Sequence, residues 1–188
     1  MMAAGFVLAG GRSSRMGRDK ALLKLNGQTL VERALGSLRE VCSEVAIAGG
    51  AEELARFGRL IPDQKAGCGP LEGIVAALEQ SSFEWNLFLA VDMPYVPSAV
   101  WLRLLERAED AKAIGVMARS LGQVQPLCAV YARRASGRLR EELQAGRWKI
   151  TAAAAAAGDV ECVDFEEEEW FRNLNTQEEF RTSATSVE

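Results

Sequence analysis

The residues best suited to chemistry lie in two short segments, one near the start of the chain and one near its middle. The first, residues 6–20, is an apolar run that breaks into a basic loop, Phe-Val-Leu-Ala-Gly-Gly-Arg-Ser-Ser-Arg-Met-Gly-Arg-Asp-Lys. From Arg12 to Lys24 there are five Lys or Arg residues against one acid, Asp19, in a chain whose formal net charge is -4. Such a local reversal of charge indicates an anionic ligand.

The backbone and side chains of this loop suit phosphate groups. Gly10 and Gly11 have no Cβ atom, so their N–H groups can approach a ligand closely, and Arg15 and Lys20 can reach separate phosphates. The loop is not a P-loop, because Gly17 is followed by Arg-Asp and not by Lys-Ser or Lys-Thr. The Gly-x-Gly-x-x-Gly pattern of dinucleotide-binding loops is also absent.

The second segment, residues 87–95, is an apolar run that ends in Asp92 and is then stopped by Pro94. A carboxylate at the end of a strand can hold Mg²⁺ over phosphates bound by the first loop. The chain contains no histidine, which excludes imidazole metal sites and histidine-based acid–base catalysis and leaves oxygen ligands for Mg²⁺ or Mn²⁺. A capping or turn-forming role next to proline is the structural alternative for Asp92.

Strands and helices alternate in the pattern of apolar residues, with short apolar runs predicting strands and helical spacing predicting helices. The expected strands are residues 5–8, 44–48, 59–61, 85–91, 114–118 and 126–131; the expected helices are residues 30–41, 71–80, one capped by Ser98, and the alanine tract 152–157. This succession predicts an α/β fold of three layers, a doubly wound and mostly parallel sheet with helices on both faces. Ligands of such folds bind beyond the carboxyl ends of the strands. Residues 1–188 are expected to form one domain.

Composition places the chain among soluble globular proteins. Hydrophobic residues make up 48% and charged residues 26%, and no apolar run approaches the roughly 20 residues needed to cross a membrane. The N-terminal Met-Met-Ala-Ala is too short for a signal peptide, so we expect a cytoplasmic location. The four widely spaced cysteines are expected to be reduced packing residues. A sequence pI of about 5.2 gives no support for nucleic-acid binding.

The first loop carries a family resemblance. Its pattern Leu8-Ala-Gly-Gly-x-Ser-x-Arg-Met-Gly-x-Asp-Lys20 resembles the signature of nucleotidyltransferases related to molybdenum cofactor guanylyltransferase, the MobA family. Asp92-x-Pro lies where that family keeps its metal-binding aspartate, and residues 69–73 resemble its Gly-Pro-Leu-x-Gly turn beside the nucleoside. Gln125-Pro resembles the start of the strand that lines the acceptor side. The resemblance covers nearly the whole chain and is weak only between residues 149 and 163.

By this resemblance the fold is a Rossmann-like nucleotidyltransferase fold and the reaction is transfer of GMP from GTP to the terminal phosphate of molybdopterin carrying molybdenum. The products are a guanine dinucleotide cofactor and pyrophosphate. Mg²⁺ is the expected cofactor, held by Asp92. Proteins that mature molybdenum-dependent enzymes are expected partners.

The resemblance also implies roles for individual residues. Arg15, Lys20 and Asp92 are the expected catalytic residues, and Asp63 is expected to accept hydrogen bonds from N1–H and the 2-amino group of guanine. The residues expected to bind the nucleotide are Leu8, Ala9, Gly10, Gly11, Lys20, Asp63 and Asp92.

Several alternatives remain open at this stage. The nucleotide can be CTP, the acceptor can be a sugar phosphate, or the chain can be a non-catalytic carrier that only binds a nucleotide or cofactor. Asp63 is nearly as well explained as an acid in a surface turn. Asn173 and Asn175 resemble the family's Asn-x-Asn-Thr-Pro motif, with Gln177 in place of proline, and can contact metal or cofactor phosphate or form only local turn bonds before a last helix.

Overall fold

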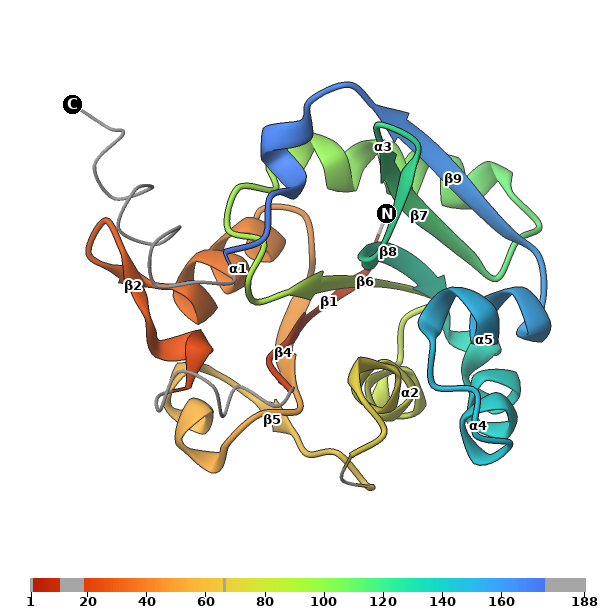
Figure 1. Ribbon diagram of the computed structural model, residues 1–188, viewed down its shortest axis with the longest axis horizontal. Helices are drawn as coiled ribbons and strands as arrows, with labels where there is room; N and C mark the ends of the chain where they lie inside the picture. The colour runs from red at the N-terminus through yellow and green to blue at the C-terminus, as the bar shows by residue number, and fades with distance from the viewer. Residues whose placement is uncertain (1, 11–18, 66, 175–188) are drawn as a thin grey trace.

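The computed structural model describes residues 2–10, 19–65 and 67–174. Its centre is a seven-stranded sheet in the order β5-β4-β1-β6-β8-β7-β9 (Figure 1). The strands are β1 (Ala4–Leu8), β4 (Glu44–Ala48), β5 (Leu60–Ile61), β6 (Trp85–Ala90), β7 (Gly115–Ser120), β8 (Gln123–Ala132) and β9 (Val160–Phe165). Within this sheet β8 alone runs antiparallel to its neighbours. The prediction of a mostly parallel, doubly wound sheet is confirmed.

Helices cover both faces of the sheet (Figure 1). On one face lie α1 (Leu30–Arg39) and α3 (Ser98–Asp110); on the other lie α2 (Pro70–Gln80), α4 (Ser136–Gln144) and α5 (Ile150–Ala157). The short 3-10 helices are η2 (Lys20–Leu22), η3 (Glu52–Phe57), η4 (Arg133–Ala135) and η5 (Glu168–Phe171), and a small hairpin joins β2 (Lys24–Leu25) to β3 (Gln28–Thr29). Three layers result, as the sequence predicted.

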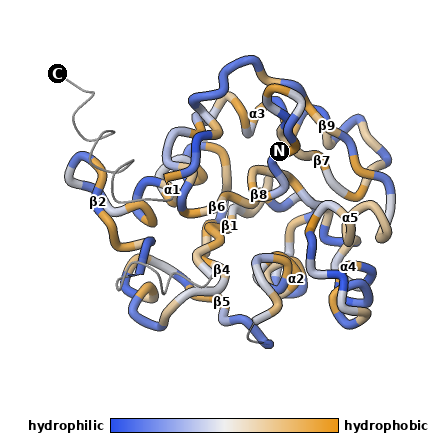
Figure 2. Tube along the Cα trace, in the orientation of Figure 1, coloured by the Kyte–Doolittle hydropathy of each residue, from blue (hydrophilic) through white to orange (hydrophobic). Residues whose placement is uncertain are grey.

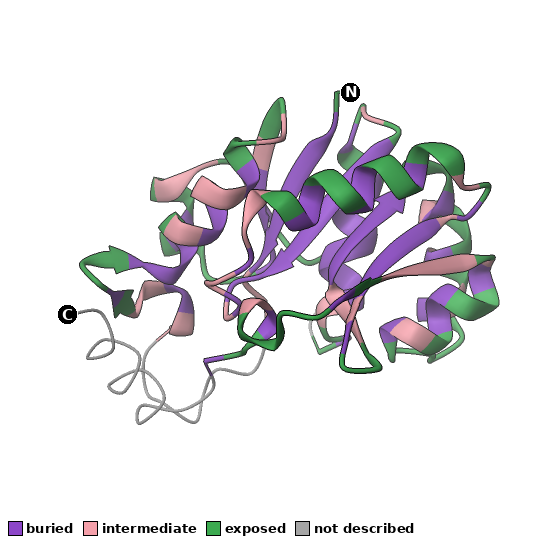
Figure 3. Cartoon of the chain, turned by 90° about the horizontal axis from the view of Figure 1, so that it is seen from above, coloured by how far each residue is buried: buried purple, intermediate pink, exposed green. Residues whose placement is uncertain are grey.

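The central strands are apolar because both of their faces are covered. Every residue of β1 and β6 is buried, and the strands form the hydrophobic interior of the molecule (Figures 2 and 3). Parallel strands between two helical layers require such continuous apolar sequences. On the α2 side the ring of Phe6 stacks on that of Phe88 at 5.2 Å, and Phe88 meets Tyr131 edge-on at 5.7 Å. The core therefore fixes β1 and β6 side by side.

Helix α1 begins with a capping box. Thr29 Oγ1 accepts a hydrogen bond from Glu32 N at 3.3 Å, and Glu32 Oε2 accepts one from Thr29 N at 2.8 Å. Two N–H groups at the helix start are thereby satisfied. We expect Thr29→Ala to lower the free energy of unfolding by about 1 kcal/mol, a usual loss for a missing cap. Urea denaturation followed by circular dichroism measures this, and Lys24→Ala, at an exposed position of β2, is expected to change it little.

The β2–β3 hairpin and the 3-10 helices were not predicted from the sequence, and three further differences have a clear physical reason. The expectation that Ser98 caps a helix was wrong: Pro97 occupies the cap position of α3, with no side-chain cap bond, and Ser98 is the first helical residue. Strand β9 was missed because its residues, Val-Glu-Cys-Val-Asp-Phe, mix polar and apolar types and belong to an edge strand with only Phe165 fully buried. Helix α4 was missed because only Leu139 and Leu143 mark its buried face.

All four cysteines are free thiols. Burial raises the pKa of Cys42 to about 12, so this thiol stays protonated and unreactive at neutral pH. Among the described residues, no helix is both long and apolar enough to pass through a lipid bilayer.

Candidate active site

The loops that carry the predicted site residues leave one edge of the sheet, where the parallel strands β1, β4, β5 and β6 end. Backbone hydrogen bonds continue beyond the strands. Val91 N donates to Leu8 O at 3.1 Å, Ala9 N donates to Ala48 O at 3.1 Å, and Gly49 N donates to Ile61 O at 2.8 Å. Three loops therefore begin from one rigid platform, as expected for ligand sites in doubly wound folds.

Lys20 and Asp92 meet at this edge although they are 72 positions apart in the sequence. Lys20 Nζ donates to Asp92 Oδ2 at 2.8 Å, and the two side chains are 15% and 24% exposed. Lys20 stands on η2, whose first turn is capped by Asp19 Oδ1 accepting from Ala21 N at 2.9 Å. The structure thus brings together the cation and the carboxylate that the sequence assigned to one phosphate site.

The backbone on both sides of Asp92 is also fixed. Met93 N donates to Ala90 O at 3.1 Å, which makes a tight turn after β6, and Leu174 N donates to Asp92 O at 2.9 Å. Asn173 is exposed and adjoins Leu174, so its segment runs beside the turn that carries Asp92. Asn175, Gly11 and Arg15, the other candidates of this region, lie outside the described residues.

The carboxylate of Asp92 fits a magnesium site of the kind completed by a substrate. Among residues 2–10, 19–65 and 67–174, no group of three or more His, Cys, Asp or Glu side chains could hold a metal ion by itself. Mg²⁺ on phosphate substrates commonly takes only one or two carboxylates and receives its other ligands from phosphates and water. A single, partly exposed oxygen donor at the end of a strand matches that requirement.

Asp63 lies against Gly10 and Gly49. A Cβ atom added to Gly10 would lie 3.4 Å from Asp63 Oδ2, and one added to Gly49 would lie 3.0 Å from Asp63 Oδ1 and 3.1 Å from the Gly10 Cα atom. Gly49 has φ +72°, in the left-handed region that favours glycine. Glycine at both positions thus allows three loops to touch, and this contact was not predicted from the sequence.

Asp63 is an exposed residue, but its carboxyl group is partly desolvated. This partial desolvation raises its pKa, and the negative charge of Glu72 raises it further. Next to it, the start of α2 packs tightly on β1, because a Cβ atom on Gly73 would lie 3.2 Å from Leu8 Cδ2. The close approach explains the small residue at the end of the Gly-Pro-Leu-x-Gly turn.

The model of the MobA-like NTP transferase domain matches residues 5–159. The chain belongs to this family. It is similar to two proteins named probable molybdenum cofactor guanylyltransferase. The one from Pelotomaculum thermopropionicum is 40% identical over 80% of this chain and 73% of its own length. The one from Opitutus terrae is 38% identical over 92% of this chain and 89% of its own length.

A solved structure agrees with the fold of this MobA-like chain. Molybdopterin-guanine dinucleotide biosynthesis protein A from Archaeoglobus fulgidus superposes with a TM-score of 0.80 at 26% identity, and the match covers 96% of both chains. The family assignment and the expected nucleotidyltransferase fold are therefore confirmed.

The MobA-like sheet is interrupted next to the site. Between β7 and β8 the pairing shifts from Met117 opposite Ala129 to Ala118 opposite Gln125, so residues 126–128 of β8 form a bulge with no partner on β7. Tyr131, which is buried, donates its hydroxyl hydrogen to Pro126 O at 3.1 Å and supports the bulge. Gln125 and Pro126, expected on the acceptor side, thus lie where β8 departs from β6, at the edge that carries Asp92.

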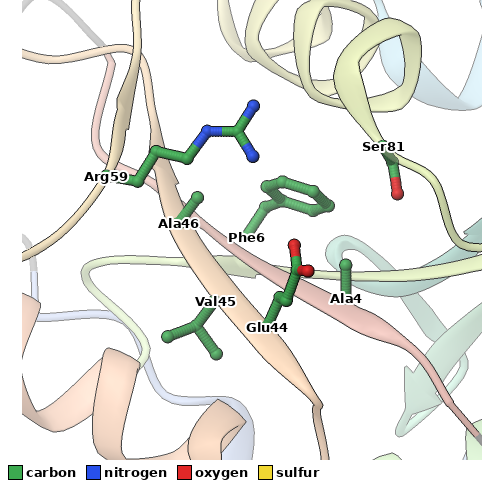
Figure 4. Close-up of a pocket in the computed structure, with 7 residues that line it drawn as sticks. All are labelled: Ala4, Phe6, Glu44, Val45, Ala46, Arg59 and Ser81. Carbon is green, nitrogen blue, oxygen red and sulfur yellow. The ribbon is translucent and has the colours of Figure 1, made fainter.

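One cavity, of about 240 Å³, lies away from these residues (Figure 4). Its lining includes Ala4 and Glu44, the first residues of β1 and β4, and Ser81 at the end of α2. These positions mark the amino ends of the parallel strands, the edge opposite Asp92. The cavity is therefore separate from the candidate active site.

Proposed function

We propose that this protein transfers GMP from GTP to the terminal phosphate of molybdopterin carrying molybdenum, which gives a guanine dinucleotide cofactor and pyrophosphate. The observation that carries the proposal is the meeting of Lys20 and Asp92 at 2.8 Å beyond the carboxyl end of β6. It is supported by family membership and by the names of the relatives, which specify guanylyl transfer in molybdenum cofactor synthesis.

The chain's first task is to hold the triphosphate. We assign the nucleoside to the backbone of residues 8–11 and charge balance on the β- and γ-phosphates to Arg15 and Lys20. Asp92 would hold Mg²⁺ at the same edge of the sheet. The ion supplies positive charge to the phosphate oxygens when bound. Binding the triphosphate and Mg²⁺ in this way is the role that we propose for the loops at the carboxyl ends of β1 and β6.

The second task is to align two phosphates. An oxygen of the acceptor's terminal phosphate forms a bond to the α-phosphorus of GTP, while the bond from that phosphorus to the bridging oxygen of the β-phosphate breaks and pyrophosphate leaves. A phosphate monoester is already ionised near neutral pH, so no side chain has to remove a proton. The protein contributes by positioning the two phosphates and by neutralising the charge of the triphosphate with Lys20 and Arg15.

The decisive experiment is mass spectrometry of the product after incubation with GTP, MgCl₂ and molybdopterin carrying molybdenum. We expect the acceptor's mass to increase by one GMP residue and one pyrophosphate to be released per acceptor. Parallel reactions with CTP, and with a sugar phosphate as acceptor, test the alternative transferases. Binding of GTP without pyrophosphate release would contradict transfer and favour a carrier.

Asp63→Ala is expected to weaken GTP binding more than binding of CTP or ATP. The carboxylate of Asp63 is assigned two hydrogen bonds to guanine, and their loss should reduce GTP affinity by roughly tenfold or more. Because its pKa is raised, the wild-type protein should also lose GTP affinity on acidification from a higher pH than an ordinary aspartate would. Only the ionised carboxylate accepts both bonds.

Isothermal titration calorimetry with the three nucleotides measures both effects. Asp63→Asn, titrated over the same pH range, accounts for protonation of the nucleotide's own phosphates and should lack the step that belongs to Asp63. Equal losses of affinity for GTP, CTP and ATP would remove Asp63 from base selection.

Two further proposals concern the location of the protein in the cell and the proteins that receive its product. We place the protein in the cytoplasm, which is supported by its four free thiols. Proteins that mature molybdenum-dependent enzymes are the proposed recipients of its product.

A further inference from the structure

A charged network of four residues lies behind the loop that carries Asp63. It consists of Gln64 in that loop, Glu72 and Glu79 on α2, and Arg140 on α4; we call it the Gln64 network. No step of the proposed reaction uses these side chains. Their contacts reach the site through the residue next to Asp63.

Gln64 is held at two points. Its backbone N donates to Glu72 Oε1 at 3.2 Å, and its side-chain Nε2 donates to Glu79 Oε2 at 3.0 Å. Two bonds of this kind fix both the backbone and the side chain of one residue. The neighbouring Asp63 therefore has little freedom to move away from Gly10 and Gly49.

Arg140 holds both carboxylates in place. Its Nη1 donates to both oxygens of Glu72, at 3.2 and 3.0 Å, while Nε and Nη2 donate to the two oxygens of Glu79 at 3.0 and 2.9 Å. Hydrogen bonds to these acids raise the pKa of Arg140, and those from Arg140 lower the pKa of Glu79. A guanidinium fork suits this double task, whereas the ammonium of lysine cannot present donors to both acids in one plane.

The burial of Glu72 makes Arg140 necessary. The Glu72 side chain is 1% exposed and that of Arg140 is 18% exposed, so the carboxylate depends on this cation for its neutralisation. A buried ion pair contributes little net stability compared with apolar packing of the same size. The pair therefore calls for a role other than stabilising the fold, and its contact with Gln64 N provides one.

We propose that Glu72 and Arg140 are positioning residues for guanine selection: through Gln64 they hold the Asp63 carboxylate where it can meet N1–H and the 2-amino group together. This inference rests on the proposed function. A carboxylate can accept hydrogen bonds from N1–H and the 2-amino group together only if its plane is fixed. A shift of the loop that carries Asp63 would break one of these two bonds while the other remained. The network thus couples α4 to the choice of nucleotide.

The test compares Arg140→Gln with Arg138→Gln in steady-state guanylyl transfer. Arg138 lies on the same helix and donates to Ala157 O, with no contact to Gln64, so it is a matched control. We expect Arg140→Gln to raise the KM for GTP by about tenfold with kcat nearly unchanged, the loss expected for one hydrogen bond to a charged group. The control should keep both constants.

Inosine triphosphate, which lacks the 2-amino group, separates positioning from a merely structural effect. Wild type should prefer GTP in kcat/KM, and Arg140→Gln should narrow that preference, since a misplaced carboxylate no longer uses both donors. Arg140→Lys should restore part of it. A loss of folded enzyme alone would lower kcat per total protein and leave both the KM values and the GTP preference as they were.

Gln64→Ala provides a second variant in case Arg140→Gln does not fold. Gln64 is exposed, and its alanine variant removes the bond to Glu79 while leaving the ion pair intact. We expect a smaller rise in the KM for GTP and a smaller loss of GTP preference. If wild type makes the dinucleotide and the foldable variants keep its KM and preference, the inference is wrong while the function stands; if wild type makes no dinucleotide, the proposed function itself is wrong.

Discussion

Asp92→Ala should lower kcat/KM for guanylyl transfer by about a thousandfold, the range found when one charge-stabilising group is removed from an enzyme site. Asp92 supplies the carboxylate at the end of β6 to which we assign Mg²⁺, and the described residues around it offer no cluster of acids to replace it. Its backbone bond to Leu174 N does not involve the side chain, so the turn should keep its shape. Initial rates of pyrophosphate release over a range of GTP concentrations, repeated at several MgCl₂ concentrations, measure the loss.

Asp164→Ala is the matched control for this prediction. Asp164 lies on β9, at the far side of the sheet, where it accepts two hydrogen bonds from Arg119 at 2.6 and 2.7 Å. Its removal deletes an exposed ion pair and should leave guanylyl transfer within about twofold of wild type. Near-wild-type transfer by Asp92→Ala would disprove the metal assignment.

The second large effect is expected for Lys20→Ala, which should lower kcat/KM by about a hundredfold and raise the KM for GTP. The Lys20 side chain is mostly buried, and its Nζ lies 2.8 Å from Asp92 Oδ2. When GTP binds at this edge of the sheet, a phosphate would replace Asp92 as the anionic partner of Lys20. The charge of the ammonium group would therefore stay neutralised in the complex. Without it, the triphosphate would lie beside Asp92 with less charge compensation.

Lys24→Ala tests whether the effect is specific to Lys20. Lys24 is exposed on β2, four positions further along the same basic segment. If the basic segment acted only by general attraction of anions, Lys20→Ala and Lys24→Ala would lose GTP affinity equally, and both losses would depend strongly on salt concentration. That result would contradict a specific role for Lys20. Lys20→Arg should recover part of the activity, because it retains the charge but not the compact ammonium.

The sequence predicted the central part of the fold because its strands have a strong local signature. Strand β1 is an apolar run and β6 is nearly so, with Asn86 as its one polar residue. Parallel strands place their carboxyl ends at one edge, which was enough to bring Lys20 and Asp92 together. The edge strand β9, at the end of the strand order opposite β5, was harder to predict. Strand β9 needs only one fully buried residue to pair with β7, so tertiary pairing and not its own periodicity makes it a strand.

The sequence analysis named the charged residues of the candidate site but not the residues that hold them in position. Glu72 reads locally as an acid in the first turn of α2, a position that the helix dipole favours without any partner. Its real partner, Arg140, is 68 positions away, and nothing near either residue marks the pair. Gly49 likewise gained its meaning only when the loops after β1 and β5 were seen to close on it.

The hydrogen bond from Leu174 to Asp92 has a consequence for the order of biosynthesis. The central strands can pair while the ribosome is still translating, but the turn after β6 receives this bond only when residue 174 has emerged from the exit tunnel. A nascent chain shorter than this can hold a complete sheet and still lack the bond that braces the Asp92 turn, to which we assign Mg²⁺. We therefore expect competence for transfer to arise late in translation, after the sheet has formed.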